Sequence, residues 1–523
     1  MGANAKPTNR RPGSLPVASF PLKVACVDMG SNAIRFIAAE FRGDKDHEVL
    51  LAERRPVRLG HGVFLTGKLV EGAMDAAVQA LGDFAARMEE LGVEHYRAVA
   101  TSAVREAKNG AAFVARVAEE TGLELELISG SEEARLVHLA VVNRINLHDE
   151  QWILVDLGGG SVEVSLVDAN GILWSESHTM GSVRLLEELA GSAQEPGRFQ
   201  RLLGEYIATL KIPSAANQAA PAGFAATGGN IESLAKLAGE HLPSGVSELT
   251  LARLRSMIGT LARLSYRERV EQLHLREDRA DVILPAAMVF ERLAELCGAD
   301  KITVPHVGIK EGVLYDLVDR LTQHRRQEAS QARVVQAGAL TLGRRYFFDE
   351  PHALHVASLA LSLFDQLQAL HGLGGGARKI LQAAALLHDV GQYVSYKRHH
   401  KHTLYLLRYS ELPNFSPAEM ALVAAVARYH RKSEPADHHF VWDRLSAEAQ
   451  DEVRRLAAIL RVADAMDREH LQRVKSVSAE VTPHEVIIHP RGSGELLLEG
   501  WSITKKGQMF SSVYDRKVRV KAD

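Results

Sequence analysis

The chain has 523 residues, of which 46% are hydrophobic and 24% charged, and its formal net charge is −3. This length predicts several domains, and the composition is ordinary for a globular protein. The near-neutral charge argues against specific nucleic-acid binding, and no apolar run approaches the roughly 20 residues that a membrane helix needs. We therefore expect neither a nucleic-acid partner nor a membrane anchor.

Residues 1–20 are rich in Pro, Gly, Asn and Arg and lack the apolar core of a signal peptide. We expect a disordered tail here. The two cysteines, Cys26 and Cys297, lie in apolar segments, which favours buried thiols in a reducing compartment. Together these features predict a cytoplasmic protein.

Residues 21–138 are predicted to form a first α/β domain that opens with a hairpin, VACVDMGSNAIRFIAAEF. The first strand of this hairpin carries Asp28 near its end, and the turn after it contains Gly30, Ser31 and Asn32. Successive N–H groups in such a turn can hold an anion, and a neighbouring carboxylate can hold a cation. The sequence therefore indicates a phosphate-plus-metal site in outline.

Two later segments of this domain carry charged residues that chemistry could use. Arg105, in TSAVREAKNG, either faces a phosphate or is a solvated surface arginine. Glu132 and Glu133 follow a Ser-Gly turn at a predicted helix start, where carboxylates are common because the helix dipole favours them. Alternatively, one of them takes a proton from water, and composition does not decide which glutamate that is.

Residues 139–320 are predicted to form a second domain, in which ILVDLGGGSVEVSLVD repeats the first hairpin. The repeat has carboxylates at Asp156 and Glu163, and its turn consists of Gly158, Gly159, Gly160 and Ser161. Alone it could be an ordinary hairpin, but the repetition favours a functional site. Further on, Gly228 and Gly229 end a short strand and open a helix, whose N-terminus can bind anions.

Two Asp-Gly hairpins followed by a Gly-Gly helix start resemble the actin-like ATPase and sugar-kinase superfold (ASKHA, ribonuclease H-like). That resemblance implies a duplicated α/β fold with a phosphate cleft between its two halves.

Residues 325–475 are predicted to be entirely helical and are rich in histidine. Imidazole and carboxylate ligands that converge from several helices can hold one or two divalent metals. The ordered set resembles an HD phosphohydrolase domain, and the best matches are His355, His388, Asp389, His430 and Asp464. Residues 476–523 show strand-like alternation, which predicts a small C-terminal α+β appendage whose role is open.

Over nearly the whole chain the sequence resembles the exopolyphosphatase / guanosine-pentaphosphate phosphohydrolase (Ppx/GppA phosphatase) family. The segments that carry the resemblance occur in family order: VDMGSNAIR, RLGHGVFLTGKL, TSAVREA, ISGSEEARL, VDLGGGSVE, MGSVRL and ATGGN. The resemblance implies Glu133 as general base, Arg105 as the family arginine, and Asp156 and Glu163, with Asp28, near a catalytic Mg²⁺. It implies that the turns around Gly30–Asn32 and Gly158–Ser161 bind phosphate. It also implies a homodimer.

Phosphoryl transfer to water requires mainly positioning and charge neutralisation, which these residue types can supply. We therefore predict Mg²⁺-dependent release of terminal phosphate from inorganic polyphosphate. Guanosine pentaphosphate is the alternative substrate, since the same cleft could hold either phosphate chain. An actin-like ATPase or kinase and a polyphosphate-binding regulator without turnover are the remaining alternatives.

Overall fold

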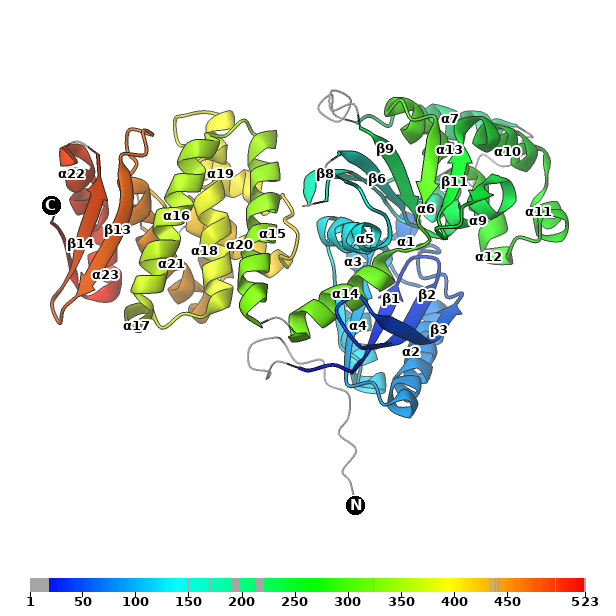
Figure 1. Cartoon of the computed structure of the whole chain (residues 1–523), viewed down its shortest axis with the longest axis horizontal. Helices are drawn as coiled ribbons and strands as arrows, with labels where there is room; N and C mark the ends of the chain where they lie inside the picture. The colour runs from blue at the N-terminus through cyan, green and yellow to red at the C-terminus, as the bar shows by residue number, and fades with distance from the viewer. Residues whose placement is uncertain are drawn as a thin grey trace, which may run out of the picture. The chain divides into compact units, whose positions relative to one another are not determined.

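The computed structural model describes residues 18–148, 150–169, 171–189, 197–212, 221–322, 324–432, 434–436, 439, 442–493 and 495–521. The chain divides into two compact units, Met1–Glu328 and Ala329–Asp523 (Figure 1). Residues 1–17 of the predicted tail lie outside the described residues. In the rest of it, the Ala18 N–H donates to the carbonyl of Leu321 at 2.9 Å, and Phe20 packs on a buried cluster.

The first unit contains a five-stranded sheet of order β3-β2-β1-β4-β5. Its strands are β1 (Leu22–Met29), β2 (Ile34–Phe41), β3 (His47–Arg55), β4 (His95–Ala100) and β5 (Leu125–Leu127). The strands β3, β2 and β1 pair antiparallel, whereas β4 and β5 continue the sheet in parallel.

The second sheet of this unit has seven strands in the order β10-β11-β12-β9-β6-β7-β8. Its strands are β6 (Trp152–Leu157), β7 (Val162–Val167), β8 (Ile172–His178), β9 (Gly223–Thr227), β10 (Glu240–His241), β11 (Ser247–Thr250) and β12 (Lys301–Val304). The run β8-β7-β6-β9-β12 repeats the antiparallel and parallel pairing of β3-β2-β1-β4-β5. This repetition confirms the duplicated, actin-like α/β fold with mixed sheets.

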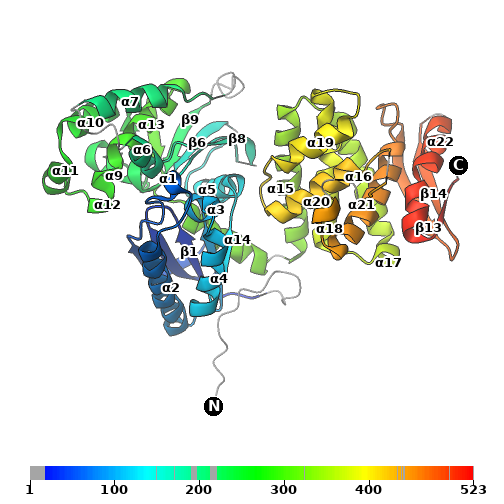
Figure 2. The same cartoon turned by 180° about the vertical axis from the view of Figure 1, so that it is seen from behind.

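Both faces of each sheet are covered by buried clusters, which explains why the central strands β1 and β6 are mostly apolar apart from the carboxylates near their ends. The helices of the first half are α1 (Val63–Thr66), α2 (Glu71–Leu91), α3 (Ser102–Glu106), α4 (Gly110–Thr121) and α5 (Gly130–Arg144). Those of the second half are α6 (Ser182–Leu189), α7 (Arg198–Ala208), α9 (Gly229–Ala238), α10 (Leu251–Arg263), α11 (Tyr266–Leu273), α12 (Glu277–Ala280), α13 (Ile283–Leu296) and α14 (Ile309–Thr322). On β1, Ala25 and Val27 belong to the core that includes α2 and α4, while Val24 and Cys26 pack with α14. Figure 2 shows these helices beside β1.

The predicted division at 138/139 falls inside helix α5, and α14 returns to pack on β1 and α5 of the first half. Among the described residues both cysteines are free; Cys26 is buried, whereas Cys297 is partly exposed just after α13. None of the helices in the described ranges is long and apolar enough to cross a membrane.

The second unit is a bundle of helices that ends in a three-stranded sheet of order β13-β14-β15 (Figure 1). Its helices are α15 (His324–Arg345), α16 (Glu350–Gln366), α17 (Gln368–His371), α18 (Gly375–Leu387), α19 (His399–Arg408), α20 (Pro417–Arg428), α21 (Ala447–Ala465), α22 (Leu497–Lys506) and α23 (Gln508–Tyr514). Two short 3₁₀ turns are η2 (Val390–Tyr393) and η3 (Trp442–Arg444), and the strands are β13 (Val474–Val481), β14 (Glu485–Gly492) and β15 (Lys517–Val520). One hydrophobic cluster includes Leu456 of α21 together with Ile488 of β14 and Phe510 of α23, so the C-terminal α+β segment shares its core with the helices.

Candidate functional site

The two hairpins place charged residues at equivalent positions of the two halves. Asp28 lies opposite Arg35 in the β1–β2 register, and Asp156 lies opposite Glu163 in the β6–β7 register. Each hairpin turn is closed by the same type of bond. The Gly30 N–H donates to the Ala33 carbonyl at 3.1 Å, and the Gly158 N–H donates to the Ser161 carbonyl at 3.0 Å. The repeat therefore extends to the geometry of the turns.

The two turns are in contact with each other. A Cβ at Gly159 would lie only 2.8 Å from the Ser31 Cβ, and one at Gly160 would lie 2.4 Å from the Ser102 Oγ. The hydroxyls of Ser31 and Ser102 are 3.1 Å apart. Because Gly159 and Gly160 have no side chains, the second hairpin turn can pack directly against the first, and the two predicted phosphate-binding turns lie side by side. Asn32 extends the contact by donating to the Asp278 carbonyl at 2.9 Å.

The third glycine segment lies against the second hairpin. Gly228 precedes α9 with a φ of 100°, a conformation that L side chains rarely adopt. A Cβ at Gly228 would lie 2.8 Å from the Leu157 carbonyl oxygen, and one at Gly229 would lie 2.3 Å from a guanidinium nitrogen of Arg279. The glycines predicted to bind phosphate therefore come together from both halves.

Four carboxylates are buried beside these turns: Asp28, Glu133, Asp156 and Glu163. Burial raises the pKa of Glu133 to about 7; the Arg105 guanidinium, 2.7 Å away, opposes this shift, and the charges of Asp156 and Asp28 add to it. Burial, followed by the charges of Glu133 and Asp156, also holds the pKa of Glu163 well above its usual range. Burial, reinforced by repulsion among these carboxylates, thus raises the pKa of both Glu133 and Glu163 and favours their protonated forms.

Neighbouring side chains hold some of the carboxylate oxygens in place. Ser177 donates to Glu163 at 2.9 Å, Thr227 donates to Asp156 at 2.6 Å, and Arg35 donates to Asp28 at 2.8 Å. Burial still raises the pKa of Asp156, although the Thr227 bond lowers it. The second oxygens of Asp28 and Glu163 are buried and have no hydrogen-bond partner within the described parts of the chain. Buried oxygens of this kind are suited to a cation.

The structure distinguishes the two adjacent glutamates at the start of α5. Glu132 points into a buried network, where it accepts hydrogen bonds from Arg135 at 2.8 Å and from Arg97 at 3.1 Å. Burial raises the pKa of Glu132, but these two guanidinium groups outweigh it and lower the pKa to about 2. Glu132 is therefore held ionised by its ion pairs with Arg97 and Arg135, and Glu133 is the one that faces the carboxylate cluster.

Comparison with known proteins identifies the family of this chain. The family model of the Ppx/GppA phosphatase family matches residues 37–321, and the model of Ppx/GppA phosphatase domain III matches residues 334–489. The chain belongs to the Ppx/GppA phosphatase family. The resemblance expected from the sequence is thereby confirmed.

Solved structures of this family are similar to the chain. A crystal structure of an exopolyphosphatase from Cytophaga hutchinsonii is 28% identical, covers 57% of this chain and 98% of its own, and has a TM-score of 0.53. An Aquifex aeolicus member of the Ppx/GppA family is also 28% identical, covers 57% of this chain and 97% of its own, and has a TM-score of 0.47.

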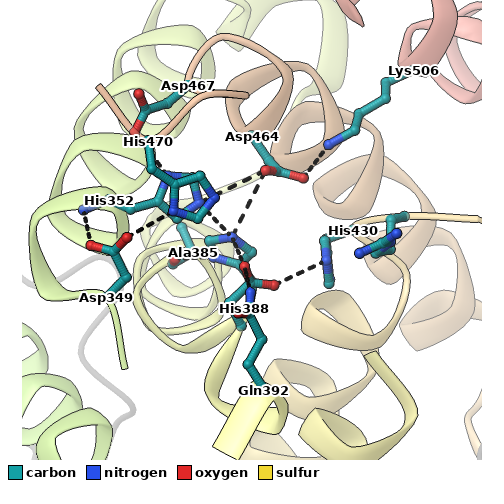
Figure 3. Close-up of polar contacts among 12 residues, drawn as sticks. Asp349, His352, Ala385, His388, Gln392, His430, Asp464, Asp467, His470 and Lys506 are labelled. Carbon is teal, nitrogen blue, oxygen red and sulfur yellow. Dashed lines mark hydrogen bonds and ion pairs between the residues drawn. The ribbon is translucent and has the colours of Figure 1, made fainter. Parts of the chain in front are cut away.

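Domain III contains a second cluster of polar residues, shown in Figure 3. Potential ligand atoms lie within 4.8 Å of one another in the groups His352–His388–Asp464, Asp389–His399–His430 and His352–Asp389–His470. Four of the five residues predicted for a second metal site are thus together: His388, Asp389, His430 and Asp464. In the described ranges of the first unit, the carboxylates of Asp28, Asp156 and Glu163 form no group that meets this distance.

His355 is the exception, and its prediction as a ligand is corrected here. The face of α16 that turns inward carries His352 and Val356, both fully buried, whereas His355 is only partly buried and contacts the backbone of Val474. The helical spacing of buried positions could have selected His352 from the sequence. The same signal would have found His399, because it shares a buried stripe of α19 with Thr403 and Leu407.

Proposed function

We propose that this Ppx/GppA phosphatase is an exopolyphosphatase, which removes the terminal phosphate of inorganic polyphosphate with a water molecule activated by Glu133. The observation that carries the proposal is the position of Glu133, which is buried among the carboxylates beside two glycine turns and is held by Arg105 at 2.7 Å. Burial there raises its pKa to about 7. A general base is most efficient when its pKa lies near the working pH. The likeness to the structure named an exopolyphosphatase favours polyphosphate as substrate.

In this proposal the Glu133 carboxylate accepts a proton from water, and the resulting hydroxide oxygen bonds to the terminal phosphorus as the bridging P–O bond breaks. Arg105 holds the carboxylate in position through its 2.7 Å ion pair. Because the N–H groups of Gly30 and Gly158 donate within their own turns, we assign phosphate binding to the N–H groups that follow them, at Ser31–Asn32 and Gly159–Ser161. Those N–H groups would neutralise charge on the non-bridging oxygens.

The first unit also offers a suitable set of atoms for Mg²⁺. The buried, unpartnered oxygens of Asp28 and Glu163 are hard oxygen donors of the type Mg²⁺ prefers, and Asp156, opposite Glu163 in the β6–β7 register, adds a third carboxylate. Mg²⁺ usually binds one or two carboxylates and completes its shell with water and substrate phosphates, so a preformed three-ligand group is not required. When bound, the ion would neutralise charge on the phosphate chain.

The test is phosphate release by the full-length protein from polyphosphate and, separately, from guanosine pentaphosphate, each with Mg²⁺. We expect turnover of polyphosphate, its loss in Glu133→Gln, and its retention in Glu119→Gln, which changes an exposed glutamate of α4. Turnover of guanosine pentaphosphate alone would reassign the substrate. Formation of ADP from ATP without phosphate release from polyphosphate would instead support a kinase or ATPase.

Binding of polyphosphate without release of phosphate would support a regulator. A cytoplasmic location and a homodimer are part of the same proposal, and light scattering in solution tests the dimer.

A further inference from the structure

Four histidines of domain III share one pattern of hydrogen bonding, in which Nδ1 contacts an acceptor and Nε2 faces another histidine. In each ring Nδ1 lies against an oxygen that can only accept a hydrogen bond: Asp467 Oδ2 for His352 (2.8 Å), the Ala385 carbonyl for His388 (2.7 Å), the Tyr396 carbonyl for His399 (3.2 Å) and the Ala427 carbonyl for His430 (2.7 Å). Each Nδ1 must therefore carry a proton, and in the neutral ring each Nε2 presents a lone pair. This is the arrangement that orients metal-ligating histidines.

The four Nε2 atoms form two close pairs, both buried inside the helical bundle of domain III. The His352 and His388 Nε2 atoms are 3.3 Å apart, and those of His399 and His430 are 3.2 Å apart. Two neutral rings with this tautomer cannot donate to each other, because both Nε2 atoms are acceptors. Each pair therefore needs a positive charge between its members.

Two carboxylates complete the arrangement, and one of them reaches both pairs. Asp389 places Oδ2 3.8 Å from the Nε2 of His388, and it places Oδ1 3.0 Å and 3.4 Å from those of His399 and His430. This Oδ1 is buried and accepts no hydrogen bond from the described residues. Asp464 lies on the other side, with Oδ1 3.9 Å and 4.0 Å from His352 and His388.

We propose that domain III binds two divalent transition-metal ions, one at His352, His388 and Asp464 and the other at His399 and His430, with Asp389 bridging them. Of this set, His352, His388, His430 and Asp464 are labelled in Figure 3. Imidazole and carboxylate donors suit Mn²⁺, Fe²⁺ or Zn²⁺ better than Mg²⁺, which prefers oxygen ligands alone. This site is independent of the proposed hydrolysis of polyphosphate in the first unit.

The charge balance identifies the class of ligand that the ions would take. Two divalent ions exceed the charge of two carboxylates, and Lys506 of α22 adds a further cation by its ion pair with Asp464. Arg431 adds another, with Nη1 3.2 Å from the His399 Nε2. A centre with this excess of positive charge recruits an anion that can contact both metals, and a phosphate group matches it in charge and in number of oxygens.

The experiment measures Mn²⁺ binding to the full-length protein, stripped of metal with a chelator and then dialysed against Mn²⁺ in excess Mg²⁺, which occupies the first unit. We expect two Mn²⁺ per chain in the wild type, one in His352→Gln and one in His399→Gln. His355→Gln is the matched control, because it changes a neighbouring histidine on α16 outside the cluster, and it retains two. We also expect the paramagnetic resonance spectrum of the wild type to show a coupled ion pair, and we expect both single-site variants to lose it.

Added inorganic phosphate is expected to alter the Mn²⁺ spectrum, with at least a fivefold weaker apparent affinity in Lys506→Gln. Wild-type stoichiometry of one or less, or the same loss in His355→Gln as in His352→Gln, overturns the paired centre. A spectrum that phosphate leaves unchanged overturns the assigned ligand. Circular dichroism shows that each variant is folded, and because Mn²⁺ binding is measured directly, the result is independent of whether polyphosphate is hydrolysed.

Discussion

Replacement of Glu133 by glutamine keeps the shape of the side chain at the start of α5 but removes its ability to accept a proton. Loss of a positioned general base costs roughly 10²- to 10⁴-fold in rate, which corresponds to about 3–5 kcal/mol of transition-state free energy. We expect phosphate release from polyphosphate to fall by this factor in Glu133→Gln, while the affinity for polyphosphate changes little.

The raised pKa also predicts how wild-type activity depends on pH. With a pKa of about 7, about one tenth of the Glu133 side chains are ionised at pH 6 and about nine tenths at pH 8. The base must be ionised to act, so the rate at saturating substrate should rise through pH 7 and level off above pH 8. The measurement is initial phosphate release against pH in a constant-ionic-strength buffer with saturating Mg²⁺.

Stability should change in the opposite direction to activity. A carboxyl whose pKa is higher in the folded than in the unfolded protein stabilises the fold below its unfolded pKa of 4.5, and this stabilisation is lost as pH rises through 7. At pH 8 the ionised, buried Glu133 therefore costs on the order of 3 kcal/mol, which Glu133→Gln relieves. The variant should melt at the same or a higher temperature than the wild type at pH 8.

Glu132→Gln is the matched comparison, because it makes the same change one residue earlier. Its carboxylate is paired with Arg97 and Arg135, and removal of one partner from a buried ion pair costs about 3–5 kcal/mol. We expect a clear loss of thermal stability there, with turnover reduced only by loss of folded protein. A folded Glu133→Gln enzyme that releases phosphate at the wild-type rate would refute the assignment of the base.

Three further predictions concern the surroundings of this base. Gly159→Ala should lower stability by about 1–3 kcal/mol and reduce phosphate release, because its Cβ would lie 2.8 Å from the Ser31 Cβ; Gly171→Ala, with nothing within 4 Å, is the control in both assays. Thr227→Val removes the 2.6 Å donor to Asp156 and should cost about 1–3 kcal/mol in denaturant unfolding. It should also raise the pKa of Asp156, so that the pH–rate profile moves to higher pH. A profile that does not move would show that ionisation of Asp156 does not affect the rate. Removal of Mg²⁺ with a chelator should abolish phosphate release, and Asp156→Asn should require a higher Mg²⁺ concentration for half-maximal rate; turnover that persists in the chelator would contradict the cation site.

The architecture of the first unit could be predicted from its sequence because the signal is local. Apolar strands that flank Asp-Gly turns predict hairpins, and two such hairpins in series predict a duplicated sheet. The pairing of Asp156 with Glu163 across β6 and β7 requires the register, which depends on the turn of residues 158–161. That register could not be predicted from the apolar pattern of the strands.

The adjacent glutamates show where local reasoning ends. Glu132 and Glu133 have the same residue type and the same helix position to within one residue. Their roles differ because Glu132 meets Arg97 of a distant strand, which also pairs with Asp316 of a distant helix. Only the packing of β4 and α14 against α5 brings those partners together. On α16 the choice is between His352 and His355 as the residue of the metal cluster. There the helical spacing of the buried positions, which include His352 and Val356 but not His355, selects His352.

The hairpins of the two halves close their turns with the same type of bond but carry different cross-strand pairs. Where β2 places Arg35 opposite Asp28, β7 places Glu163 opposite Asp156, so one copy of the repeat pairs a carboxylate with a guanidinium and the other pairs two carboxyl groups. Linear polyphosphate, the substrate proposed above, has two chemically identical ends. Only the protein can therefore distinguish the ends of a chain bound across the two repeats, and the difference between Arg35 and Glu163 is one feature that makes their surroundings unequal.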